Sequence, residues 1–400
     1  QIGSGDVYMV PNTRAHQVIP SWVAFTPNGV LVGDDARDQD ITNPENTVYD
    51  MKRFIGRRWS DSVAEEARLH PFRLVDNNGT PAVAPTVAPY DSQLFSPQQI
   101  GSFILKELKK SAEDHIGGIV ERVVLAVPVD FDDDQIEATK EAAVLAGMKV
   151  AHVVTEPTAA AMAYGLHESA KLQEILVYDM GGGTLDVSLL ACASGVFSVL
   201  AVDGDNYLGG EDVNHVMMAH FAKLMLEKDG YDAYISKQSL QQLRDDMEAA
   251  KRELSEAPST VIRFQSGSYS FISELTREAF EAICEPLFTR LLDPVKSALA
   301  KGRRRPQDID SIVLVGGSTR IPFVREQIQR FFEDRLELYL KVPPEQAVAI
   351  GAGIQAAIVG HYWPLPTAAI ENWDVIKAMR SGQPLGGDEE DEDEEVPPPA

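Results

Sequence analysis

The chain has 400 residues, of which 44% are hydrophobic and 24% are charged, a composition typical of a globular protein long enough to bury more than one core. Its formal net charge of −25 excludes nucleic acid as an expected partner, because a polyanion is bound by clustered lysine and arginine. The sequence has no run of about 18 apolar residues, so it predicts no transmembrane segment. The two cysteines, Cys192 and Cys284, are too few for a cysteine-based metal framework.

The hydrophobic patterns, taken in chain order, predict an α/β fold. Short strands and turns occupy residues 6–32, and from residue 98 onward helical and strand patterns alternate. We expect helices at 98–116, 134–145, 159–166, 237–254, 277–299, 324–332 and 345–359. We expect strands at 122–128, 149–154, 174–178 and 311–315, with a further β region at 260–271. After residue 360 the pattern offers one more helix, at 370–380, before a block of acids at 388–395 whose mutual repulsion predicts a disordered tail.

Three glycines at 181–183 follow the expected strand at 174–178 and lie between two acids. Consecutive glycine N–H groups can form an anion-binding concavity, and a backbone without Cβ atoms can approach phosphates closely. Asp179 can hold a hydrated magnesium ion through water, and Thr184 and Asp186 add a hydroxyl and a second carboxylate. A triple glycine alone favours a plain hairpin turn, but the flanking acids and the hydroxyl favour a phosphate site.

A second glycine-bearing strand end occurs at 316–320, after the expected strand at 311–315. The glycine N–H groups there can meet a ribose or a phosphate, and the flat guanidinium of Arg320 can stack on an adenine ring. The alternative is an ordinary strand-to-helix loop in which Ser318 caps the helix. The recurrence of glycines at two strand ends suggests two related lobes.

Other candidate residues are ambiguous when each is considered alone. Glu156 stands where a helix should begin, so it either caps that helix or positions a metal or a water molecule. Lys52 lies in a basic cluster, and by itself it is typical of a solvated surface. A third group lies at helical spacings of three and four, hence along one helix face, where surface ion pairing is the alternative to ligand binding: Glu248, Lys251, Arg252 and Ser255.

In combination, these segments resemble the nucleotide-binding domain of the heat shock protein 70 (DnaK/BiP) chaperones over about residues 5–360. The resemblance is carried, in order, by NPENTV at 43–48, KRFIG at 52–56, EPTAAAMAYGL at 156–166, DMGGGTLD at 179–186, LGGED at 208–212 and VLVGGSTRIP at 313–322. Within the family, the details are most similar to the microsomal stress-seventy ATPase core. The resemblance implies an actin-like (ribonuclease H-like) α/β fold with two lobes of four subdomains around a nucleotide cleft.

The implied domain is 1–360, with lobe I at about 1–168 and lobe II at about 169–360, followed by a C-terminal extension at 361–400. The implied ligands are ATP or ADP with Mg²⁺, the latter held through water by Asp179 and Glu156. The catalytic set that the resemblance implies is Lys52, Glu156, Asp179, Thr184 and Asp186. The implied nucleotide-binding set is Gly181, Gly182, Gly183, Gly209, Gly210, Glu211, Glu248, Lys251, Arg252, Ser255, Gly316, Gly317, Ser318, Arg320 and Glu345.

Two departures from the family pattern qualify these roles. The family's first phosphate loop, a strand leading to Gly-Ile-Asp-Leu-Gly-Thr-Thr, would lie upstream of Gln1, so we expect the sequence to be a fragment rather than a natural protein without that loop. Glu345 stands where the family has an aspartate near adenosine, and a longer acid of the same charge should have a small effect.

The leading functional hypothesis is ATP binding with slow hydrolysis, in protein folding or quality control, through co-chaperones or nucleotide exchange factors and without a peptide-binding domain of its own. A nucleotide-binding scaffold without turnover is the first alternative. A sugar kinase of the same superfold is a second alternative that the chaperone-like segments disfavour. The resemblance places the protein in the endoplasmic reticulum lumen, with the cytoplasm as the alternative.

Overall fold

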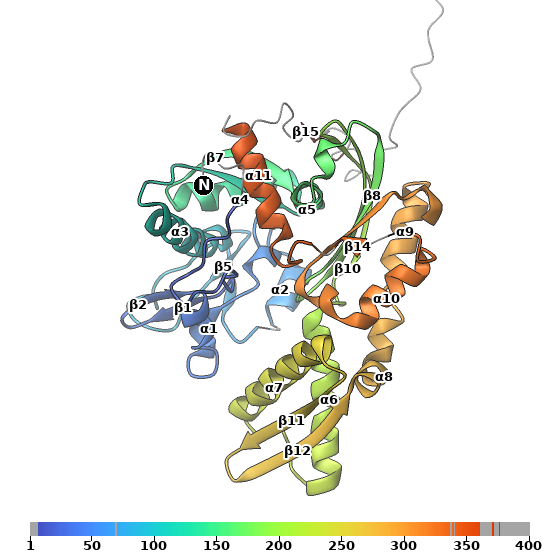
Figure 1. Cartoon of the computed structure of the whole chain (residues 1–400). Coiled ribbons are helices and arrows are strands. Elements are labelled where there is room, and N and C mark those ends of the chain that lie inside the picture. Colours follow the sequence, from blue (N-terminus) through green and yellow to red (C-terminus); the bar gives the residue numbers. More distant parts are fainter. Residues whose placement is uncertain are drawn as a thin grey trace, which may run out of the picture.

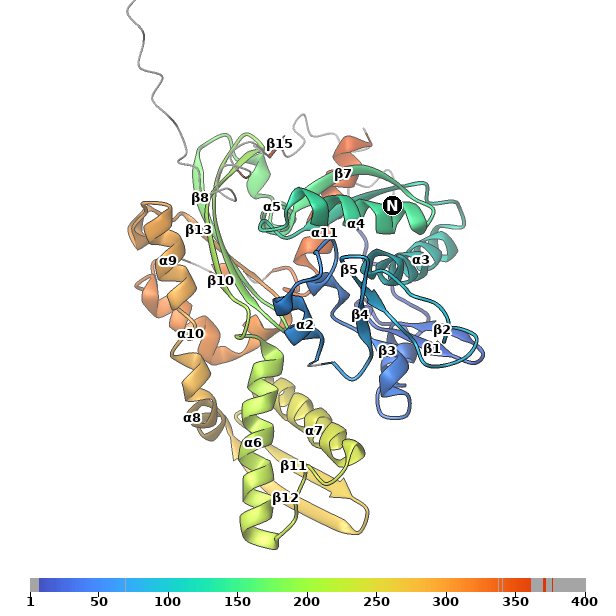
Figure 2. The ribbon, with the colours of Figure 1, turned by 180° about the vertical axis from the view of Figure 1, so that it is seen from behind.

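A computed structural model of the chain describes residues 7–360 except 69, 337 and 340, together with residues 370, 371 and 376. Two α/β lobes stand side by side, and Figures 1 and 2 show them from opposite sides. We use lobe I for residues 7–168 and lobe II for residues 173–360 together with residues 370 and 371. Among the described residues, no helix is both long enough and apolar enough to cross a membrane.

The outer part of lobe I is built from small antiparallel sheets around an aromatic core. A hairpin turn at 27–28 joins its first two strands, as the Pro-Asn-Gly sequence predicts. Phe25, Phe54 and Phe95 are buried in its core. Its elements are β1 (Val23–Thr26), β2 (Gly29–Val32), α1 (Asp34–Arg37), β3 (Thr47–Val48), the 3-10 helix Met51–Arg53, α2 (Asp61–Ala67), β4 (Leu74–Asn77) and β5 (Thr80–Val83).

The inner part of lobe I is a parallel strand pair with helices packed around it. Capping boxes begin two of the helices, with Ser96 and Gln99 at one and Asp132 and Gln135 at the other. Its elements are α3 (Pro97–Ile116), β6 (Arg122–Val127), α4 (Asp133–Leu145), β7 (Lys149–Thr155) and α5 (Glu156–Ala163). The strand order places Thr155 and Glu156 at the carboxyl end of β7, which is where ligands of open α/β sheets usually bind.

Lobe II is centred on a mixed sheet with the strand order β14-β13-β8-β9-β10-β15. Strands β8 and β13 are parallel neighbours, and Asp179 pairs with Val315, so the two strands end side by side. The sheet therefore brings the two glycine-bearing loops together. Its strands are β8 (Gln173–Met180), β9 (Leu185–Ala193), β10 (Val196–Asp205), β13 (Ser311–Val315), β14 (Leu338–Tyr339) and β15 (Ile370–Glu371).

Helices and one hairpin complete lobe II, and Figure 2 shows the hairpin beside α6 and α7 at the end of the lobe. The last helix, α11, crosses to lobe I and packs on α5. A Cβ on Gly351 would lie 1.7 Å from the carbonyl oxygen of Ala159, so only glycine permits this approach. The elements are α6 (Gly210–Asp229), α7 (Lys237–Glu256), β11 (Ser259–Ser266), β12 (Tyr269–Thr276), α8 (Arg277–Phe288), α9 (Asp293–Lys301), α10 (Pro322–Phe331) and α11 (Ala347–Val359).

Two of the predicted elements were wrong. The helix expected at 277–299 is two helices, α8 and α9, because the chain breaks at 289–292 and restarts with Pro294 in the first turn of α9. The helix expected at 370–380 is wrong at its start, because Ile370 and Glu371 form strand β15. Ile376 is helical, as predicted, and the rest of that prediction lies outside the described residues, as does the acidic block at 388–395.

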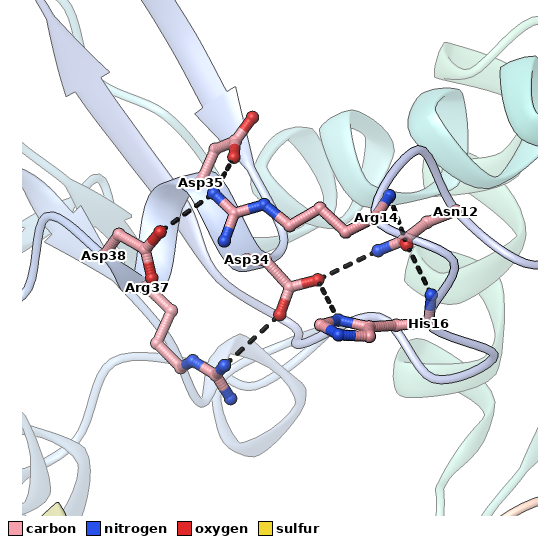
Figure 3. Close-up of polar contacts among 7 residues, drawn as sticks. All are labelled: Asn12, Arg14, His16, Asp34, Asp35, Arg37 and Asp38. Atoms are coloured by element: carbon pink, nitrogen blue, oxygen red, sulfur yellow. Dashed lines mark hydrogen bonds and ion pairs between the residues drawn. The ribbon is translucent and has the colours of Figure 1, made fainter.

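A polar network fixes the loop that precedes β1 (Figure 3). The buried carboxylate of Asp34, at the start of α1, accepts a hydrogen bond from Asn12 at 2.9 Å and lies 3.0 Å from His16 Nδ1. Arg14 forms ion pairs with Asp35 and Asp38. Burial acts to raise the pKa of Asp34, but the contacts with His16 and Asn12 lower it overall. The network holds residues 12–16 against α1.

Candidate functional site

The two glycine-bearing loops meet at the ends of β8 and β13. Ser318 donates a hydrogen bond from Oγ to the carbonyl oxygen of Gly181 at 2.7 Å. Gly316 has φ +81°, and a Cβ there would lie 2.2 Å from the carbonyl oxygen of Met180. Only glycine fits at this position, because any side chain would meet both the positive φ and the neighbouring backbone.

The three glycines at 181–183 are both a hairpin turn and part of a larger loop cluster. They connect antiparallel β8 and β9, as the simpler interpretation predicted. Their carbonyl groups also accept from the start of α6, with Gly210 N to Gly181 O at 3.1 Å and Glu211 N to Gly182 O at 2.7 Å. No described residue accepts from the N–H groups of Gly182 and Gly183, which leaves these donors available for an anion.

Gly209 and Gly210 pack directly on this loop. A Cβ on Gly209 would lie 2.4 Å from the carbonyl oxygen of Gly182, and one on Gly210 would lie 2.6 Å from Ser318 Oγ. Lys251 donates from Nζ to the carbonyl oxygen of Gly210 at 2.8 Å. The structure therefore brings three predicted glycine segments, at 181–183, 209–210 and 316–317, into one cluster.

Lys52 and Glu156 form an ion pair beside this cluster, with Nζ 2.6 Å from Oε1. Lys52 lies in the 3-10 helix Met51–Arg53, and Glu156 is the first residue of α5, where the helix dipole favours a carboxylate. Desolvation in the cleft acts to lower the pKa of Lys52, but the charges of Glu156, Asp179 and Asp186 raise it overall. Lys52 therefore carries a positive charge at neutral pH.

Asp179 and Asp186 face the same space from β8 and β9. Desolvation, with repulsion from Glu156 and Asp186, raises the pKa of Asp179 to about 7. Desolvation likewise raises the pKa of Asp186, although Thr184 donates a hydrogen bond to its Oδ2 at 2.8 Å. Carboxylates that repel one another in this way are suited to a cation, because a positive charge would relieve the repulsion.

A cavity of about 210 Å³ lies among these carboxylates. Asp130 and Asp203 also line it, beside Glu156, Asp179 and Asp186. Among the described residues, no three acidic, histidine or cysteine side chains converge to form a direct metal site. Carboxylates spread around a cavity suit a hydrated cation held through its water molecules, a form in which magnesium is often bound.

The α7 residues form a charged group behind the glycine cluster. Glu248 lies 2.6 Å from Lys251 Nζ and 2.6 Å from Arg252 Nε. Burial acts to raise the pKa of Glu248, but Lys251, Asn214 and Arg252 lower it to about 2. Ser255 donates its hydroxyl proton back to the carbonyl of Lys251 at 3.0 Å.

Arg320 and Glu345 form a two-pronged ion pair at the outer end of the site, with Nη2 to Oε1 at 2.9 Å and Nε to Oε2 at 3.2 Å. The longer side chain of Glu345 therefore reaches the residue that we expect to contact the base. Glu211 instead pairs with Arg244, whose Nη2 lies 2.8 Å from Oε1. The predicted part of Glu211 in nucleotide binding stays a prediction.

Some site residues were missed by the sequence analysis. Asp130 and Asp203 line the cavity, and each lies near the end of a strand, which is the signal that would have identified them. Arg53 places Nη2 2.7 Å from the position of a Cβ on Gly183, so its guanidinium borders the phosphate loop. Arg53 lies in the KRFIG segment that carries the family resemblance, but the resemblance assigned a role only to its neighbour Lys52.

Comparison with known proteins identifies the family. A model of the family described as Hsp70 protein matches residues 2–364, which is most of the chain. The chain belongs to the heat shock protein 70 family. It has the actin-like ATPase fold of the Hsp70 nucleotide-binding domain, as the sequence predicted, with its lobes arranged around the site described above.

Two curated Hsp70 relatives show how much of such a protein the chain represents. It is 43% identical over 362 residues to heat shock 70 kDa protein BIP3 of Oryza sativa subsp. japonica, covering 89% of this chain and 54% of that protein. It is 42% identical over 358 residues to a ribosome-associated molecular chaperone of Zygosaccharomyces rouxii, covering 88% of this chain and 58% of that protein. The chain thus spans between half and three fifths of the length of these relatives.

Proposed function

We propose that the chain binds ATP or ADP with magnesium and hydrolyses ATP slowly to ADP and phosphate. The observation that carries the proposal is that two glycine-bearing strand ends meet beside a cavity lined by Glu156, Asp179 and Asp186. Lys52 joins this group through its ion pair with Glu156. Backbone donors without side chains suit phosphates, and clustered carboxylates suit the cation that accompanies them. Hsp70 family membership agrees with this function.

In the proposed reaction, the protein contributes positioning and charge rather than a covalent step. Lys52 directs a fixed ammonium at the terminal phosphate and at the attacking water. Asp179 and Glu156 accept hydrogen bonds from water molecules, and bound magnesium would supply the charge that neutralises the phosphates. Thr184 and the N–H groups of the glycine loop donate to phosphate oxygens, while Asp186 orients the water network.

Adenosine would lie between α7 and the 317–320 loop. Arg252 and Arg320 are each held by a carboxylate, Glu248 and Glu345 respectively, and each presents a flat cation that can stack on a base. Held side chains lose less conformational freedom on binding, so these ion pairs preorganise the adenosine side.

The test is calorimetric titration of Mg-ADP and Mg-ATP into the purified chain, with phosphate release measured on the same sample. We expect Lys52→Ala to lower phosphate release about 100-fold or more while Mg-ADP still binds, because ADP lacks the phosphate that Lys52 contacts. Lys140→Ala is the matched control, since Lys140 forms an ion pair with Glu137 at 2.7 Å on exposed α4. It should change neither quantity.

The other outcomes distinguish the alternatives. Binding without phosphate release would support a nucleotide-binding scaffold. Failure of a folded sample to bind either nucleotide would refute the proposal. Equal loss of phosphate release in Lys52→Ala and Lys140→Ala would refute the role of Lys52.

The cellular role belongs to the same proposal. One relative is named as a heat shock 70 kDa protein and the other as a molecular chaperone, which supports a role in protein folding or quality control through co-chaperones or exchange factors. The predicted absence of a peptide-binding domain stays a prediction. The endoplasmic reticulum lumen also stays a prediction, because one relative at similar identity is named as ribosome-associated.

A further inference from the structure

A buried carboxylate joins the two lobes next to the candidate catalytic acids. Glu371 is 8% exposed and lies in β15, which pairs in parallel with the start of β10 at the edge of the lobe II sheet. Its oxygens accept hydrogen bonds from the main chain and the side chain of one lobe I residue, Thr155, with N to Oε1 at 3.0 Å and Oγ1 to Oε1 at 2.5 Å. Glu371 thus connects the edge of one lobe to the end of β7 in the other.

Thr155 is an informative attachment point because a candidate catalytic acid comes directly after it in the chain. It ends β7 and is the N-cap of α5, and Glu156 is the first residue of that helix. The Thr155 hydroxyl lies 3.0 Å from the hydroxyl of Thr158 in the first turn of α5. A displacement of Thr155 would therefore move the backbone that aims Glu156 at Lys52.

The electrostatic setting suits a charged group at this point. A buried carboxylate is costly unless hydrogen bonds or charges compensate it. Here it accepts a backbone N–H and a hydroxyl proton at the N-terminus of α5, where the helix dipole carries partial positive charge. Charge-assisted hydrogen bonds are shorter and more directional than neutral ones, so they can define the position of Thr155.

We propose that Glu371 is a positioning residue that holds the junction of β7 and α5, and so aims the carboxylate of Glu156 into the nucleotide site. The inference rests on the proposed role of Glu156. Glu371 does not touch the reacting atoms. It acts through Thr155, and it ties the alignment of a lobe I acid to the edge strand of lobe II.

A different side chain of the same segment attaches it to the core. Ile376 is 1% exposed and belongs to a cluster that includes Met162 of α5 and Val199 of β10. The packing of Ile376 and the carboxylate contact of Glu371 can therefore be separated by mutation. Ile376→Ala weakens the packing and keeps the carboxylate, whereas Glu371→Gln keeps the size of the side chain and removes its charge.

The test compares Glu371→Gln with a matched acid elsewhere in the lobe II sheet. Glu174, at the start of β8, is also mostly buried and lies 2.6 Å from Arg304, away from the cavity. Three quantities are measured for each variant: the thermal midpoint, the dissociation constant for Mg-ADP, and the rate of one turnover of prebound Mg-ATP. Two further variants test the hydroxyl donor of Thr155: Thr155→Ser keeps it and Thr155→Val removes it.

We expect Glu371→Gln to slow the single turnover about tenfold while Mg-ADP affinity changes less than about twofold, because a small misalignment of a catalytic group costs rate rather than binding. Thr155→Val should also slow the single turnover, whereas Thr155→Ser, which keeps the hydroxyl donor, should turn over at the wild-type rate. Glu174→Gln should lower the midpoint without a change in rate. A wild-type rate in Glu371→Gln, or an equal loss of rate in Glu174→Gln, would overturn the inference.

The inference and the proposed function can fail separately. If the wild-type chain hydrolyses no ATP, the proposed function fails, and hydrogen exchange of the nucleotide-free protein then tests the contact itself. The Thr155 amide donates to Glu371, so it should exchange at least about tenfold faster in Glu371→Gln than in the wild type. An unchanged rate of exchange would overturn the inference.

Discussion

Replacing Asp179 with Asn should stabilise the nucleotide-free protein, and more so as the pH rises. The pKa of Asp179 is about 7 in the fold, against about 3.9 in an unfolded chain. Because the folded protein holds this proton more tightly, the wild-type fold loses stability as the pH rises from about 4 to about 7. Asn cannot ionise, so Asp179→Asn avoids that loss.

The magnitude follows from the two pKa values. Between about pH 5.5 and about pH 8, proton linkage gives a loss of about 2 kcal/mol for the wild type, and water around this partly exposed carboxylate reduces it to about 1 kcal/mol. The stability advantage of Asp179→Asn should therefore grow by about 1 kcal/mol between those pH values.

Urea unfolding of both proteins at the two pH values measures this difference. The same unfolding measurements are repeated in saturating Mg-ADP, where the opposite effect is expected because a cation near Asp179 stabilises its charged form. The wild type should then gain more stability than the variant does. The reasoning is refuted if the advantage of Asp179→Asn without nucleotide is the same at both pH values.

Two further predictions use matched pairs of residues. Gly316→Ala should lower the free energy of unfolding by about 3 kcal/mol or more, because a positive φ and the Met180 carbonyl both oppose a Cβ. Gly267→Ala, at φ +58° with no atom within 4 Å, should lower it by about 1–2 kcal/mol. Equal urea midpoints for the two variants would contradict this prediction. Arg320→Ala should weaken Mg-ADP binding about tenfold, because the guanidinium can no longer stack on the base. Arg330 forms an exposed ion pair with Glu326, so Arg330→Ala should change the calorimetric affinity for Mg-ADP by less than about twofold. Similar losses of affinity in both variants would refute the proposed contact between Arg320 and the base.

Local signals were sufficient for most of the elements. The capping residues Ser96 and Asp132 begin their helices where apolar spacing predicted them. The glycines after β8 and β13 mark strand ends correctly, because few residues other than glycine tolerate those turns. The helix expected at 277–299 failed because its apolar spacing continues through the break at 289–292, although Pro294 is a local signal for the start of a new helix.

The sequence named several residues that the structure brings together, but not the contacts between them. Motif resemblance selected Lys52 and Glu156, yet only the fold shows that these residues, 104 positions apart in the sequence, form one ion pair. Likewise, the motif around Asp179 marked it as a candidate metal-shell acid but not its raised pKa, which arises from burial and from the carboxylates of Glu156 and Asp186. Distances and charge coupling of this kind have no local signature.

Glu371 shows most clearly what the sequence could not predict, because the residues around it indicated a helix rather than a strand. Its partner Thr155 is 216 residues away, and a threonine before a helix is ordinarily explained as a cap. In the structure the hydroxyl of Thr155 donates instead to a carboxylate at the edge of the other lobe. Two residues that each have a routine local interpretation therefore form, together, the contact that links lobe II to the helix bearing Glu156.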